Sequence, residues 1–147
     1  KAELAKQYFA NCFLCRIGTV FVERSHIQQG VTDALQTTVK AKAGQSLLFF
    51  PEGTFTRVPG LLPLHMGAFI TAAQAELPIL PVTIKGTRSI LRADSKMSHH
   101  GTVTIIVDEP IVPTAADWAA AIALRNATRE VFIKNLNEPE LTPHDIP

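Results

Sequence analysis

Apolar residues along this chain recur with two periods, one helical and one extended. Residues Leu4, Tyr8, Cys12 and Cys15 fall on one face of a helix, and Val31, Leu35 and Val39 do the same further on. Gly44 follows the second of these stretches and is a residue type that commonly ends helices. The spacing predicts four helices, over residues 2–15, 28–42 and 66–76, and from a cap at Thr114 or Asp117 to about Leu136.

Four short apolar runs between these helices predict strands, at residues 17–22, 46–50, 77–84 and 102–107. Strands that alternate with helices favour an α/β fold, with a largely parallel or mixed sheet covered by helices. Pro78 and Pro81 indicate that the third strand enters the sheet irregularly or lies near an edge. We expect one domain over residues 1–136, followed by a proline-rich tail or linker at 137–147.

Two of the predicted strands end in charged residues. Ser46–Phe50 runs into Pro51-Glu52-Gly53-Thr54 and then Arg57, while Ile17–Val22 runs into Glu23-Arg24. Glycine lets backbone amides approach a ligand, and arginine can meet a phosphate with two parallel hydrogen bonds. The pattern indicates an anion site at adjacent strand ends. A solvated ion pair beside an ordinary turn is the alternative for each stretch.

Three segments in this order resemble motifs of the 1-acylglycerol-3-phosphate acyltransferases, a glycerolipid acyltransferase family. They are Gly18–Arg24, Phe50–Thr54 and Pro81-Val82. The resemblance covers roughly residues 1 to 110 and implies a glycerolipid-acyltransferase-like fold, incomplete at the N-terminus. It also implies that Arg24, Glu52, Gly53, Thr54 and Arg57 contribute to substrate binding.

The family's catalytic signature, a His followed five positions later by Asp, is not found in the sequence. None of the five histidines has Asp at that spacing, so no catalytic residue is assigned within the chain. The general base is expected upstream, and a degenerate, inactive relative is the alternative. Two further departures are Glu23, where Asp is commoner, and Phe55-Thr56-Arg57, which displaces the arginine that usually follows Thr54.

Composition narrows the remaining possibilities. A net charge of +1 gives no basic field for nucleic acid, and no apolar run reaches the ~20 residues of a membrane-spanning helix. Cys12 and Cys15 are expected to be buried apolar side chains rather than a redox or metal pair. His99-His100 is expected to be a polar loop, and neither a metal nor a cofactor is predicted.

The resemblance implies transfer of a fatty acyl group from acyl-CoA or an acyl carrier protein to a lysophosphatidic acid or related lysophospholipid. It further implies contact with a membrane surface, on its cytoplasmic side, through regions outside this sequence. A catalytically inactive lipid- or carrier-binding module of a larger multidomain protein is the alternative. An interaction domain that only scaffolds a fused enzyme is a third hypothesis, and it predicts no dependence on lipid.

Overall fold

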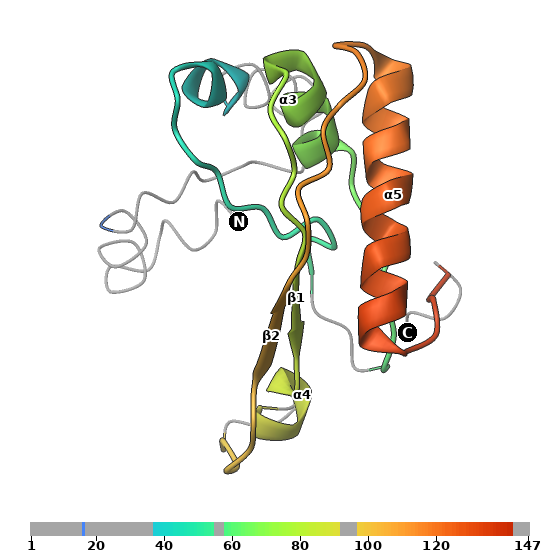
Figure 1. Ribbon diagram of the computed structural model, residues 1–147. Helices are drawn as coiled ribbons and strands as arrows, with labels where there is room; N and C mark the ends of the chain where they lie inside the picture. The colour runs from blue at the N-terminus through green and yellow to red at the C-terminus, as the bar shows by residue number, and fades with distance from the viewer. Residues whose placement is uncertain (1–15, 17–36, 55–57, 92–96, 143–147) are drawn as a thin grey trace.

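The structure is a computed structural model that describes residue 16 and residues 37–54, 58–91 and 97–142. Its elements in chain order are the helical end 37–42, α3 (Gly67–Ala75), β1 (Val82–Lys85), α4 (Thr87–Ile90), β2 (Thr104–Val107) and α5 (Trp118–Leu136) (Figure 1). The predicted helix at 2–15 and the predicted strand at 17–22 lie outside the described residues, apart from Arg16.

The predicted helix at 66–76 is confirmed as α3. Its buried face consists of Phe69, Thr71, Ala72 and Ala73. The helix ends at Glu76, which has a left-handed backbone with φ 55° and donates its N–H to the carbonyls of the preceding turn. Small side chains on this face allow a second helix to approach closely.

That second helix is α5, and the predicted start at Asp117 and end at Leu136 are confirmed. The Asp117 carboxylate accepts a hydrogen bond from Ala120 N at 2.7 Å, which satisfies one of the free amides of the first turn. Asn137 ends the helix in a left-handed conformation with φ 53°.

Asp117→Ala is expected to lower the free energy of unfolding by about 1 kcal/mol, because the Ala120 amide loses its acceptor. Asp117→Asn retains an acceptor oxygen and should lower the free energy of unfolding by only a few tenths of a kcal/mol. Urea denaturation of both variants measures the difference. Equal stabilities of the alanine variant and the wild type would show that the cap contributes nothing.

The hydrophobic core lies between α3 and α5, which run side by side (Figure 1). Phe69, Ala73, Ala121 and Leu124 are each no more than 3% exposed. Leu61 and Leu64 come from the segment before α3 and complete the same cluster. This segment is therefore fixed to the core before the helix begins.

Strands β1 and β2 form an antiparallel pair that projects from the body, with α4 at its far end (Figure 1). Val82 pairs with Val107 and Lys85 with Thr104. Ahead of β1, Ile79 and Ile111 form an isolated bridge, so the strand enters the sheet irregularly, as the prolines predicted. Asn135 of α5 holds the pair against the body by donating to the Thr83 hydroxyl at 3.1 Å.

The helix predicted at 28–42 is confirmed where it is described. Residues 37–42 are helical, and Gly44 follows with φ +82° and donates its N–H to the Ala41 carbonyl at 2.9 Å. Thr37, Thr38 and Ala41 are its buried residues, and the Thr38 hydroxyl contacts Gln74 of α3 at 3.5 Å.

The prediction of a buried strand at 46–50 is wrong. These residues form no described ladder, and Leu48 and Phe50 are 79% and 70% exposed. Their apolar character alone does not make a strand, because a strand needs neighbouring backbone groups to pair with. The turn predicted to follow, at Pro51 to Thr54, is present.

Helices, an antiparallel pair and a parallel bridge between Leu61 and Glu140 give a mixed α/β fold, as the sequence predicted. The bridge brings the start of the predicted tail onto the body. Leu141 is 7% exposed and its N–H donates to the Leu61 carbonyl at 2.9 Å. The domain boundary after residue 136 stays a prediction, and residues 137–142 pack on the body.

Candidate functional site

The turn at Phe50–Thr54 is the part of the predicted anion site that the structure describes. Gly53 N donates to the Phe50 carbonyl at 3.0 Å, and Gly53 has φ 73°. Side chains other than glycine rarely adopt this conformation, which explains the glycine at this position. Because the Gly53 amide closes the turn, the next amide that a ligand could meet is that of the exposed Thr54.

Two hydrogen bonds attach this turn to the segment before α3. The Glu52 carboxylate oxygen Oε2 accepts from Leu62 N at 3.0 Å, and the Pro51 carbonyl accepts from His65 N at 2.9 Å. Glu52 is half-buried, whereas Leu62 is 3% exposed. The turn therefore rests on a buried part of the chain although its own tip is exposed.

Three of the five predicted binding residues, Glu52, Gly53 and Thr54, are described, and as consecutive residues they share this turn; their role in binding stays a prediction. Arg24 and Arg57 lie outside the described residues. A shared pocket of Arg24 and Glu52 therefore stays a prediction.

Sequence reasoning missed Leu62 as the partner of the Glu52 carboxylate. The signal was available in Leu62-Pro63, because a residue before proline is restricted to an extended backbone. When such a residue is buried outside a ladder, as Leu62 is, its N–H needs an acceptor within the protein, and a nearby carboxylate can supply it. Nothing in the local pattern indicated which carboxylate this would be.

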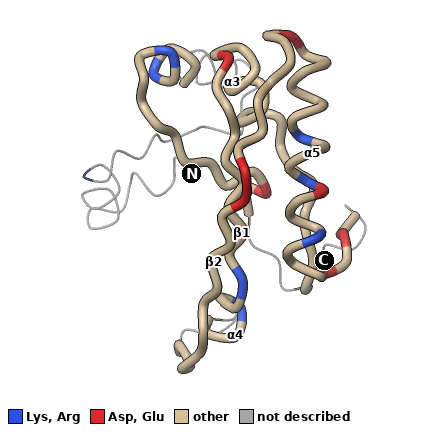
Figure 2. Tube along the Cα trace, viewed as in Figure 1, with Lys and Arg blue, Asp and Glu red and all other residues tan. Residues whose placement is uncertain are grey.

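Two cations at and just after β1, Lys85 and Arg88, are bound within the chain. Lys85 Nζ donates to the Asn135 carbonyl at 2.7 Å, and Arg88 forms a salt bridge with Glu138 at 3.2 Å. Charged positions lie on the helical end 37–42, on β1, α4 and α5 and on the connecting segments, rather than gathered in one field, whereas α3 and β2 carry none (Figure 2). Among the described residues, no cluster of three or more His, Cys, Asp or Glu side chains is arranged to hold a metal.

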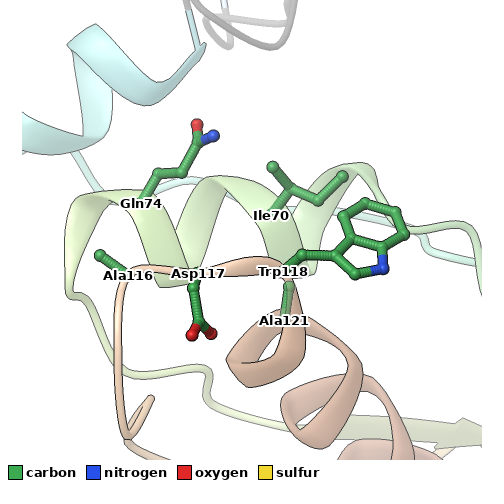
Figure 3. A pocket seen from close by; sticks show the side chains of 6 residues that line it. All are labelled: Ile70, Gln74, Ala116, Asp117, Trp118 and Ala121. Carbon is green, nitrogen blue, oxygen red and sulfur yellow. The ribbon is translucent and has the colours of Figure 1, made fainter.

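A small hollow lies between α3 and the start of α5 (Figure 3). Its lining residues are Ile70, Gln74, Ala116, Asp117, Trp118 and Ala121, and its volume is about 90 Å³. This is far below the 300 to 1,000 Å³ typical of ligand pockets. None of its residues belongs to the turn at 50–54, so the hollow is not part of the candidate site.

Among the described residues, none of the helices combines the length and the apolar character that a membrane span requires.

Comparison with known families decides what kind of protein carries this turn. The family model described as Acyltransferase matches residues 1–85, which is more than half of the 147 residues. The chain belongs to the acyltransferase family. The match includes the turn at 50–54 and the stretch that contains Arg24 and Arg57.

Curated relatives within this family are similar over different lengths of the chain. One is 1-acyl-sn-glycerol-3-phosphate acyltransferase BAT2, chloroplastic, from Brassica napus, at 40% identity over 77 residues, which are 52% of this chain and 22% of the relative. Another is the human 1-acyl-sn-glycerol-3-phosphate acyltransferase beta, at 31% identity over 134 residues, 84% of this chain and 46% of the relative. The chain thus spans less than half the length of either relative.

The acyltransferase fold is also seen in a solved structure. The 1-acyl-sn-glycerophosphate acyltransferase PlsC from Thermotoga maritima superposes with a TM-score of 0.75, covering 92% of this chain and 53% of that one, at 24% identity. The glycerolipid-acyltransferase-like α/β fold predicted from the motifs is confirmed.

Proposed function

We propose that this chain is the acyltransferase domain of an enzyme of phospholipid synthesis. The enzyme transfers a fatty acyl group from acyl-CoA or an acyl carrier protein to the free hydroxyl of lysophosphatidic acid or a related lysophospholipid. The observation that carries this proposal is the turn at Phe50–Thr54, which has the family's sequence and is fixed to the core by Glu52 and Pro51.

The reaction requires a base, a phosphate clamp and a fixed geometry. The acceptor oxygen attacks the thioester carbonyl carbon, its proton passes to a histidine base expected upstream, and the carbon–sulfur bond breaks to release the thiol. Arg24, with Arg57 as a second cation, neutralises the acceptor phosphate through charge-assisted hydrogen bonds. The Thr54 amide is a further donor toward the ligand.

The acceptor is a membrane lipid, and this supports a place at a membrane surface, on its cytoplasmic side. Attachment would come through regions outside this sequence, as a peripheral or tethered protein built of several domains. No cofactor is required, because the thioester already supplies the activated acyl group.

A catalytically inactive lipid- or carrier-binding module is the second candidate. It applies if the full-length protein, like these 147 residues, has no His and Asp at the family's spacing. The two candidates differ in one assay, which is the conversion of lysophosphatidic acid to phosphatidic acid by the full-length protein with either donor. Product formation supports the enzyme, and its absence with both donors, in a protein that still binds lysophosphatidic acid, supports the module.

Arg24→Ala in the full-length enzyme is expected to raise the KM for the acceptor roughly 10- to 100-fold, because a charge-assisted phosphate bond is worth ~1.5 to 3 kcal/mol. Arg24→Lys should recover part of the loss, since an ammonium keeps the charge but not the paired donors. Steady-state kinetics with each substrate varied in turn measure both effects.

Lys134→Ala removes an exposed cation of α5 and serves as the matched control, with acceptor kinetics like those of the wild type. A folded Arg24→Ala protein with an unchanged acceptor KM would remove Arg24 from the site. That result would support the alternative, in which Arg24 forms a surface ion pair with Glu23. Such a pair contributes ~0 to 1 kcal/mol to stability.

A further inference from the structure

The backbone N–H of Leu62 is a buried donor that no sheet ladder satisfies. Its neighbour Leu61 uses both of its backbone groups toward the tail, donating to the Pro139 carbonyl and accepting from Leu141 N, each at 2.9 Å. Successive residues of an extended chain point their N–H groups to opposite sides, so the Leu62 amide faces away from the tail. An amide buried without an acceptor would cost the fold a substantial part of its stability.

The Glu52 carboxylate is the acceptor that this amide has, with Oε2 at 3.0 Å from Leu62 N. Within the described residues this is the one hydrogen bond of the Glu52 side chain. A hydrogen bond from an amide to an ionised carboxylate is shorter and stronger than one to a neutral acceptor. The negative charge of Glu52 therefore strengthens the hydrogen bond that holds the turn to the backbone of Leu62.

A second bond, from His65 N to the Pro51 carbonyl at 2.9 Å, attaches the same turn a few residues further along. Between the two attachment points lies Leu64, which is 7% exposed and belongs to the core cluster with Phe69 and Leu124. Two bonds on either side of a buried anchor fix both the position and the orientation of the turn.

We propose that Glu52 is a positioning residue of the acyl-transfer site rather than a ligand of the substrate. By accepting the Leu62 N–H, it holds the Gly53 turn against the core, so that the exposed Thr54 is presented to the acceptor in one place. The expected effect on acyl transfer rests on the proposed function. The expected effect on the turn rests on the hydrogen bond alone.

The test uses the full-length enzyme and three variants. Glu52→Ala removes the acceptor, Glu52→Gln keeps an acceptor oxygen without the charge, and Glu109→Ala is the control at an exposed glutamate outside the turn. We expect Glu52→Ala to lower kcat about tenfold with both KM values within about twofold of the wild type, because misplacement of a positioned group acts on the reaction step. Glu52→Gln should recover most of the rate, and Glu109→Ala should match the wild type.

Amide hydrogen exchange of the peptides covering residues 58–66 supplies the structural readout. Glu52→Ala should accelerate exchange at Leu62, while Glu52→Gln should leave it close to the wild-type rate. Failure of the glutamine variant to recover the rate, or a raised acceptor KM with unchanged exchange, would overturn the positioning role and indicate direct binding. Absence of acyl transfer by the wild type would instead reject the proposed function, and the exchange result would still decide the role of Glu52.

Discussion

The 147-residue chain alone is expected to transfer acyl groups at least ~100-fold more slowly than a family member that carries the His and Asp signature, because positioned proton transfer normally contributes that much. The five histidines of the chain include none at the family's spacing, and His65, which is next to the turn, is tied to it by its backbone rather than its ring. The assay follows phosphatidic acid formed from lysophosphatidic acid and acyl-CoA by each purified protein.

A folded chain is the necessary control for this negative result. Far-ultraviolet circular dichroism reports α3 and α5, and fluorescence of Trp118, the single tryptophan, reports the start of α5. Rapid turnover by the purified chain would show that a base within it performs the proton transfer. Recovery of activity when the upstream region is joined to the chain would support the expected position of the histidine.

Gly86→Ala is expected to lower the free energy of unfolding by about 3 kcal/mol or more, whereas Gly44→Ala costs about 1 kcal/mol. The two glycines have nearly the same φ, +88° and +82°. They differ in their surroundings, because a Cβ at Gly86 would lie 2.1 Å from the Thr102 carbonyl oxygen, while one at Gly44 would meet nothing within 4 Å. The difference between the variants isolates the steric clash from the backbone strain.

Urea denaturation of both variants, followed by circular dichroism, measures this difference. The clash pushes apart the backbone just after β1 and just before β2. In Gly86→Ala, hydrogen exchange should therefore rise first in these two paired strands. Equal losses of stability in the two variants would show that Thr102 moves aside without cost.

Helices were the part of the fold that the sequence predicted well. Their information is local, as in the Asp117 cap and in the small buried residues Ala72 and Ala73, and the ends at Glu76 and Leu136 follow from it. The strand prediction at 46–50 is wrong for the opposite reason. A strand exists only through a partner, and the apolar sequence of Leu48 to Phe50 does not say whether one is available.

The candidate site likewise has a part that the sequence predicts locally and a part that depends on the fold. Gly53 could be predicted as a turn residue because glycine, which has no Cβ, readily adopts a positive φ such as the 73° seen here. The bond between Glu52 and Leu62 joins residues ten positions apart in no common helix or strand, and it is the course of the chain between them that brings them together. The short helix α4 was missed as well, since four residues carry too little pattern to distinguish a helical turn from a loop.

The parallel bridge at Leu61 has a consequence for anyone who shortens or fuses this domain. Leu61 receives the residues after α5 on one side, and Leu62 supports the Glu52 turn on the other. Gly60 is packed so closely on Pro139 and Leu141 that a Cβ there would lie 2.6 Å from either. Removing the residues after α5 would keep every motif residue in the chain but would delete the segment that packs on Gly60 and Leu61. A protease site or a fused partner should therefore be placed after Leu141.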